Sequence, residues 1–276
     1  MHKRQRQFGF SLLETMLAAG ILGVGLVLIA MIFPVGIKLT GLTTERTLGA
    51  IAADEALAKI QLYGFPDLPL WPTEPHPAPD NPEHIESIDY LTLLQMKYGL
   101  GLDGEVLNRN WSEFLYPSNE TQGDRQHYHW SALCRALNPN QVQVTVFVTR
   151  KAGQATRYYG WHRQTTTITE NNDWPSPVPV NAVVGADMRQ LIISQDDSEL
   201  MSNDATIVAD HDGRIYRVLE FNASNGIRDT LVLNDDWQPF TESESQTIWV
   251  VPPGVGSSRN PVVTVRQAVL PIQPQP

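Results

Sequence analysis

The sequence predicts an α+β protein: a long N-terminal membrane-spanning helix followed by a β-rich, antiparallel globular head. Three observations support this fold class. No charged residue occurs among the 23 residues from Thr15 to Ile37. A helical spacing of apolar residues then continues as far as Ile60. Further along, valines occupy every second position at 142–148, and more strand-like segments separated by turn residues follow.

The apolar segment is long enough to cross a membrane. As a helix rising ~1.5 Å per residue, residues 15–37 extend roughly 35 Å, more than the hydrocarbon core of a bilayer. We expect the transmembrane part at about 12–37. The helical pattern resumes beyond Pro34, and the Gly64-Phe65-Pro66 sequence should end it. A single helix over 10–63 is therefore predicted.

The residues before this helix are basic and set its orientation. Lys3, Arg4 and Arg6 lie in a leader expected at 1–9, and such residues stay on the cytoplasmic side of a membrane span. The head is therefore expected outside the cytoplasm. The chain has 20 Lys and Arg against 30 Asp and Glu, a net charge of −10; removal of the leader would leave 17 against 30, or −13. Such an acidic body argues against general nucleic-acid binding.

A proline-rich, loop-rich connector is expected over 64–130, with one short helix at 88–97. The β-rich head is expected over 131–270, and a frayed tail over 271–276. Asp212-Gly213 and Asn225-Gly226 indicate tight turns, within a meander of antiparallel strands over 204–234. The predicted strands lie at 141–148, 156–162, 189–194, 204–209, 214–221, 229–234, 246–251 and 262–269.

The start of the helix carries an unusual carboxylate. Glu14 stands at the mouth of the apolar run, where an ionised group is costly in lipid and requires a partner or a function. The junction Gly9-Phe10-Ser11-Leu12-Leu13-Glu14, with the basic leader before it and the apolar run after it, resembles the type IV prepilin family, which includes the pseudopilins of type II secretion. The resemblance covers about the first 55 residues.

The resemblance implies specific roles for three residues. A prepilin peptidase would cleave after Gly9 and methylate the new amine of Phe10. The Glu14 carboxylate would pair with the Phe10 amine of a neighbouring subunit and would contribute to assembly. The implied partners are the peptidase, other pilin or pseudopilin subunits and the inner-membrane assembly platform. The chain would lie in the inner membrane as a single-pass protein and then in a filament.

The sequence thus favours a structural subunit of a type IV pilus or a type II secretion pseudopilus, and its 276 residues favour a minor pilin. The alternative is a single-pass, membrane-anchored extracytoplasmic binding module. Such a module would need an exposed pocket, for which Trp161, Trp174, Trp237 and Trp249 are available, although they suit a core equally well. An ordinary signal peptide is disfavoured because the apolar run exceeds ~7–15 residues. No motif of an enzyme is present, and we expect no catalysis.

Two groups of residues invite a metal interpretation. Asp196, Asp197, Glu199 and Asp204 form an oxygen-rich segment that Ca²⁺ could use, but their spacing is not that of an EF-hand, and a solvated acidic loop is the favoured interpretation. The pair His127 and His129 lacks a third ligand in register, and no motif of a cysteine enzyme surrounds Cys134. All three are interpreted as ordinary residues of a strand. The single cysteine excludes an intramolecular disulfide.

Overall fold

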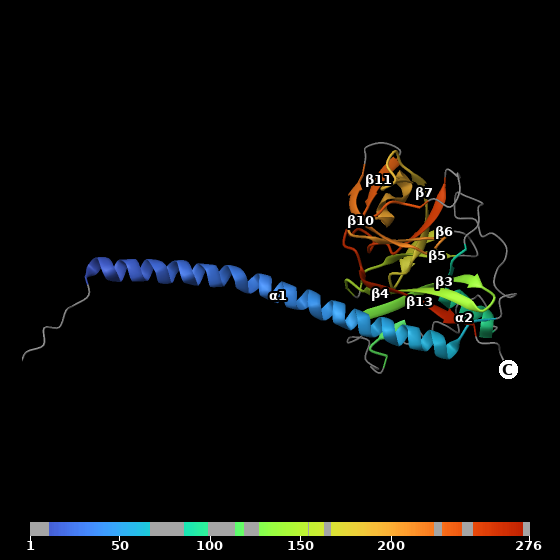
Figure 1. Ribbon diagram of the computed structural model, residues 1–276, viewed down its shortest axis with the longest axis horizontal. Coiled ribbons are helices and arrows are strands. Elements are labelled where there is room, and N and C mark those ends of the chain that lie inside the picture. The colour runs from blue at the N-terminus through green and yellow to red at the C-terminus, as the bar shows by residue number, and fades with distance from the viewer. Residues whose placement is uncertain are drawn as a thin grey trace, which may run out of the picture. The chain divides into compact units, whose positions relative to one another are not determined.

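The computed structural model describes residues 11–66, 86–98, 114–118, 127–153, 155–162, 167–223, 228–238 and 245–272. A long N-terminal helix precedes antiparallel β structure, which confirms the predicted fold class (Figure 1). The leader with Gly9 and Phe10, the Asn225-Gly226 turn and most of the proline-rich segment lie outside the described residues. Contacts divide the chain after Thr47 into two units, and each is described by itself.

Helix α1 (Leu12–Tyr63) has 52 residues, with Pro34 inside it. Its end is the predicted one. Gly64 adopts a left-handed conformation with φ of 68°, and its N–H donates to the Ile60 carbonyl at 2.8 Å. Because a residue with a Cβ pays a steric cost at this φ, glycine is the natural residue to stop the helix. The Lys97 ammonium donates to the last helical carbonyl, that of Tyr63, at 2.6 Å.

In the second unit, the last turns of α1 and a short helix, α2 (Tyr90–Tyr98), share an apolar core with one antiparallel sheet. Small residues of α1 make close packing possible, since Gly49, Ala52, Ala53 and Ala56 are all buried. The strand order is β1-β3-β4-β13, with β2 also paired to β3. The strands are β1 (Ile88–Asp89), β2 (Leu115–Tyr116), β3 (Tyr128–Asn138), β4 (Gln141–Arg150) and β13 (Val262–Pro271).

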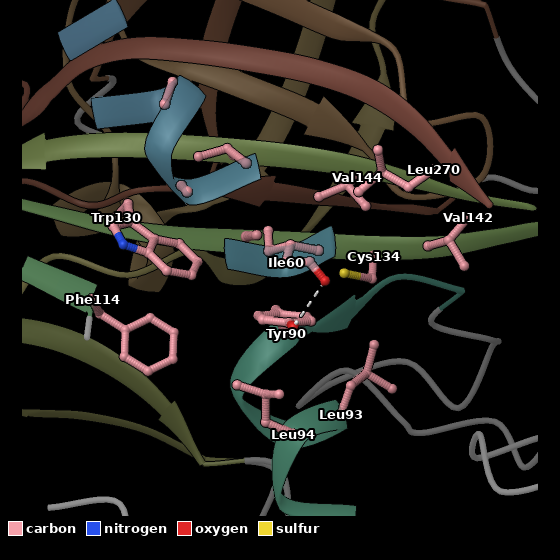
Figure 2. Packing of buried hydrophobic residues seen from close by; sticks show 14 of the residues in the cluster. Ile60, Tyr90, Leu93, Leu94, Phe114, Trp130, Cys134, Val142, Val144 and Leu270 are labelled. Atoms are coloured by element: carbon pink, nitrogen blue, oxygen red, sulfur yellow. Dashed lines mark hydrogen bonds between the residues drawn. The ribbon is translucent and has the colours of Figure 1, made fainter. Parts of the chain in front are cut away.

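The alternation predicted for 142–148 determines which face of the sheet meets the helices. Val142, Val144, Val146 and Val148 are fully buried in one core with Ile60 of α1. Tyr90 and Trp130 belong to the same core, and the Tyr90 hydroxyl donates to the Ile60 carbonyl (Figure 2). Phe147, with the opposite strand parity, is buried instead in a second cluster on the other face.

The second unit also contains a closed six-stranded antiparallel barrel, in the order β10-β11-β8-β7-β12-β9. The predicted meander is confirmed within it, because β9 pairs with β10 and β10 with β11. A 3₁₀ helix, η5 (Gln195–Leu200), follows β8, and a separate hairpin joins β5 to β6. The strands are β5 (Tyr158–His162), β6 (Thr167–Asn172), β7 (Val178–Val184), β8 (Gln190–Ser194), β9 (Thr206–Ala209), β10 (Ile215–Asn222), β11 (Arg228–Leu233) and β12 (Gln246–Val250).

The structure extends some predicted elements and adds strands that the sequence did not predict. β3 begins inside the segment expected to be connector, and β13 continues through Pro271, where the frayed tail was expected. β6 is mostly polar, and β7 contains Pro179, a residue that argues against a central strand. β7 tolerates Pro179 because this residue pairs with β12 alone. The pairing of β7 with β8 starts only at Ala182, so no β8 residue needs an N–H donor from position 179.

An apolar cluster lies between the sheet and the barrel. Leu133 and Phe147 from the sheet are buried with Val208 and Trp249 from the barrel. We call these four residues the seam. The sheet therefore has apolar contacts on both faces, with helices on one and the barrel on the other.

Candidate functional site

The first turn of α1 holds the one predicted site residue of the N-terminal junction that the structure describes. Ser11 precedes the helix, and its carbonyl accepts the N–H groups of Glu14 and Thr15 at 3.0 and 3.2 Å. Glu14 Oε2 in turn accepts the Ser11 N–H at 3.4 Å. A carboxylate in the first turn also opposes the positive end of the helix dipole. The Glu14 side chain therefore lies beside the residue that follows Phe10.

The N-terminal unit contains one helix segment long and apolar enough to cross a membrane. Its large apolar side chains, from Leu12 to Leu42, are exposed as far as the described part of the chain is concerned. Four threonine hydroxyls after the apolar run donate to carbonyls four residues earlier, at 2.9–3.0 Å: Thr40, Thr43, Thr44 and Thr47. These bonds satisfy the hydroxyl donors within the helix itself.

Glycines in this segment differ from the glycine that packs on the sheet. A Cβ added to Gly20, Gly23, Gly25, Gly36 or Gly41 meets no atom within 4 Å. A Cβ on Gly49 would lie 2.8 Å from Val263 Cγ1. Intramolecular packing therefore explains Gly49 and leaves the five earlier glycines unexplained. Glycines that leave a helix surface open allow another helix to approach closely in a membrane.

The acidic residues proposed for Ca²⁺ do not converge. Asp196, Asp197 and Glu199 lie on η5, and the Glu199 carboxylate accepts the Tyr159 hydroxyl at 2.6 Å. Asp204 instead pairs with Arg217 at 2.9 Å, from a turn where its φ is 62°. Within the described part of the chain, no three His, Cys, Asp or Glu side chains are grouped to hold a metal ion. These contacts are those of a structured turn.

Of the histidine and cysteine candidates, His129 and Cys134 are strand residues, as interpreted from the sequence, whereas His127 lies outside the strand. His129 and Cys134 are buried on β3 and His127 is exposed just before it. Burial lowers the pKa of His129 to about 3, although a hydrogen bond with the Pro175 backbone opposes the shift. The imidazole stacks on Trp174 with 5.5 Å between ring centroids. Burial, and then the nearby Asp89, raises the pKa of the Cys134 thiol, which makes it a poor nucleophile.

Two of the four candidate tryptophans, Trp237 and Trp249, are fully buried core residues, and Trp161 packs edge-on against Trp249 at 5.4 Å. Sequence reasoning missed a different group of polar residues. Arg135, Asp210 and Gln267 come together where the barrel meets the sheet, although 132 positions separate the first from the last. No local pattern marks them, because their relation depends on the packing of β3, β9 and β13.

Comparison with known proteins returned no protein-family model, no curated protein and no solved structure that matches this chain.

Proposed function

We propose that this chain is a pilin-like structural subunit, anchored by α1 in the cytoplasmic membrane and assembled through the same helix into a type IV pilus or secretion pseudopilus. The observation that carries the proposal is the N-terminal junction: a glycine, a phenylalanine and then Glu14 at the mouth of an apolar helix. Processing after Gly9 and methylation of Phe10 belong to the same proposal. Its function would be assembly, with no catalytic role.

Two features of the helix support this assignment. Among the residues that the structure describes, its large apolar side chains are exposed and five of its glycines have open space beside them, as suits a helix covered by lipid or by another helix. The helix also continues without interruption into residues that pack on the sheet. A neighbouring helix held at the glycines would thus be joined to the head through one continuous secondary-structure element.

Glu14 provides the selective contact in this proposal. In lipid, its charge is costly when unpaired, and so is the amine that cleavage after Gly9 would create. Pairing them between subunits removes both costs together. The pair would therefore favour one axial position of each subunit over its neighbours.

Incorporation into filaments tests the proposal. The full chain, expressed in a bacterium with a working type IV pilus, should appear in the sheared filament fraction as well as in the membrane. The Glu14→Ala variant should remain in the membrane, at least tenfold depleted from filaments. The Glu45→Ala variant, a matched carboxylate change outside the apolar run, should be incorporated like the unmodified chain. Retention of all three proteins in the membrane would favour the anchored binding module instead.

A further inference from the structure

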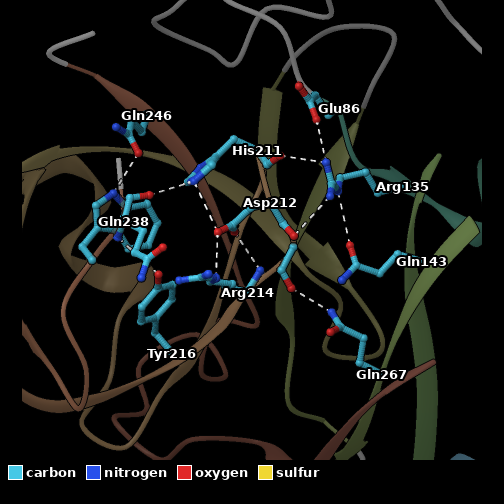
Figure 3. Close-up of polar contacts among 12 residues, drawn as sticks. Glu86, Arg135, Gln143, His211, Asp212, Arg214, Tyr216, Gln238, Gln246 and Gln267 are labelled. Carbon is cyan, nitrogen blue, oxygen red and sulfur yellow. Dashed lines mark hydrogen bonds and ion pairs between the residues drawn. The ribbon is translucent and has the colours of Figure 1, made fainter. Parts of the chain in front are cut away.

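A tight turn of the barrel, Asp210–Gly213, lies against the sheet (Figure 3). It connects β9 to β10, and the Gly213 N–H closes it by donating to the Ala209 carbonyl at 2.9 Å. Gly213 has a φ of 71°, and a Cβ there would overlap the side chain of Gln143 on β4. Glycine thus permits both the conformation of the turn and its close approach to the sheet.

The first residue of the turn is a buried carboxylate that accepts three N–H groups. Asp210 is 3% exposed. Its Oδ1 accepts Trp249 Nε1–H at 2.7 Å and the Ser87 N–H at 2.9 Å, and its Oδ2 accepts the Glu86 N–H at 2.7 Å. Residues 86–87 lead directly into β1 of the sheet. One carboxylate therefore ties the turn to strand β12 and to the chain that enters the sheet.

Three successive backbone carbonyls of the turn accept hydrogen bonds from side chains of the sheet. Arg135 on β3 donates to His211 O at 2.7 Å and to Asp212 O at 3.2 Å. Gln267 on β13 donates to Gly213 O at 2.7 Å. Arg135 also contacts Glu86 Oε2 at 3.1 Å and Gln143 Oε1 at 3.3 Å. The planar fork of a guanidinium reaches these acceptors together, which the point charge of a lysine cannot do.

We infer that the turn Asp210–Gly213 is a latch that fixes the orientation of the barrel on the helix-bearing sheet, with Arg135 as its main positioning residue. The apolar seam holds the two parts together, but hydrophobic burial is non-directional and does not by itself select one orientation. The hydrogen bonds of the latch are directional, and they engage β3, β13 and residues 86–87. Because the barrel is closed and has its own core, it can keep its fold when the latch is open.

The inference is independent of any role in filaments, and distances within the full chain test it. Spin labels at Leu62→Cys on α1 and Met188→Cys in the barrel occupy exposed positions of the second unit, whereas the native Cys134 is buried. Pulsed electron paramagnetic resonance in detergent micelles should give a narrow distribution of distances between the two labels when Arg135 is unchanged. In the Arg135→Leu variant we expect its width to increase at least twofold, with the barrel still folded by circular dichroism. The width for the Arg135→Lys variant should lie between those of the unmodified chain and of Arg135→Leu.

The matched control is Arg217→Leu, which removes an exposed arginine that pairs with Asp204 within the barrel. Its distribution should stay as narrow as that of the unmodified chain. Equal widths for Arg135→Leu and Arg217→Leu would overturn the inference. If Arg135→Leu does not fold, Gln267→Leu replaces it, because that change removes the Gly213 contact and leaves the guanidinium in place. Broadening of that variant supports the latch, and an unchanged width overturns it.

Discussion

The carboxylate of Glu14 accepts the backbone N–H of Ser11 at 3.4 Å, three residues earlier in the chain. This is one half of a capping box, in which a Glu or Gln at the third helical position satisfies the N–H of the residue that caps the helix. Glu14 thus has a partner in its own chain as well as the intersubunit partner that we propose. The two roles depend on different properties, a hydrogen-bond acceptor for the first and a negative charge for the second.

Substitutions at Glu14 separate these roles. Glutamine keeps an acceptor oxygen and loses the charge, while alanine loses both. We expect Glu14→Gln to preserve the first helical turn. In Glu14→Ala, the amides of residues 11–15 should exchange several-fold faster, since the Ser11 N–H loses its acceptor. Both variants should fail to enter filaments. Amide exchange by NMR in micelles, beside the filament assay, checks this; normal incorporation of Glu14→Gln would show that the charge is not required.

Gly49 and Gly41 form a matched pair on one helix. Alanine at Gly49 would place its Cβ 2.8 Å from Val263 Cγ1, and overpacking of this kind costs about 1–3 kcal/mol. The higher helix propensity of alanine, worth up to about 1 kcal/mol, offsets part of this cost. We therefore expect Gly49→Ala to destabilise the head by about 1–2 kcal/mol in urea unfolding followed by tryptophan fluorescence. Gly41→Ala, with no atom within 4 Å, should leave the head unchanged; equal effects would contradict the packing argument.

His129 makes the head sensitive to acid. Burial lowers its folded-state pKa to about 3, whereas an unfolded histidine titrates near 6.5. As pH falls below about 6.5, only the unfolded chain binds the proton, so stability decreases by up to ~1.4 kcal/mol per pH unit until about pH 3. Between pH 7 and 5, this group should remove about 2 kcal/mol from the free energy of unfolding.

The His129→Gln variant should lack this contribution, and its loss of stability between pH 7 and 5 should be smaller by the same amount. His127→Gln changes an exposed histidine two residues away and should retain the full pH dependence. Urea unfolding at both pH values measures the difference. A pH dependence that survives in His129→Gln would assign the acid sensitivity to other groups.

Asp210→Asn tests the buried carboxylate of the latch by a nearly isosteric change. The carboxamide has one acceptor oxygen where Asp210 has two, so its NH₂ must face a donor, either the Glu86 N–H or the Trp249 and Ser87 N–H groups. A buried donor left unsatisfied costs about 1–3 kcal/mol, and we expect destabilisation of that size by urea unfolding. Asp236→Asn, which alters an exposed ion pair with Arg189, should cost less than about 1 kcal/mol.

Local signals in the sequence predicted much of the fold. The uncharged run predicted the N-terminal part of helix α1, and Gly64 predicted its end at Tyr63. The alternation at 142–148 predicted β4. β7 escaped prediction because Pro179 breaks the strand pattern, and only the late start of its pairing with β8 makes it tolerable. Closure of the barrel was equally hidden, since β9 pairs with β12 as well as with its sequence neighbour β10.

The residues of the candidate site also differ in whether a local sequence signal marks them. Glu14 stands out in the sequence because a charge borders an apolar run. Arg135 does not stand out, because the two acceptors that join it to the barrel are backbone carbonyls 76 and 77 residues away, and these come together only after the barrel has formed. Side chains that bind backbone groups across a fold leave no spacing pattern in a sequence.

The mass of the mature N-terminus tests the central claim most directly. The full chain should be co-expressed with a prepilin peptidase, beside a Gly9→Val variant and a Gly41→Val control. Our account predicts a product that begins at N-methylated Phe10 for the unmodified chain and the control, and an intact N-terminus for Gly9→Val. An unprocessed chain, in cells where a known prepilin is cleaved, would contradict the account and leave α1 as a plain membrane anchor.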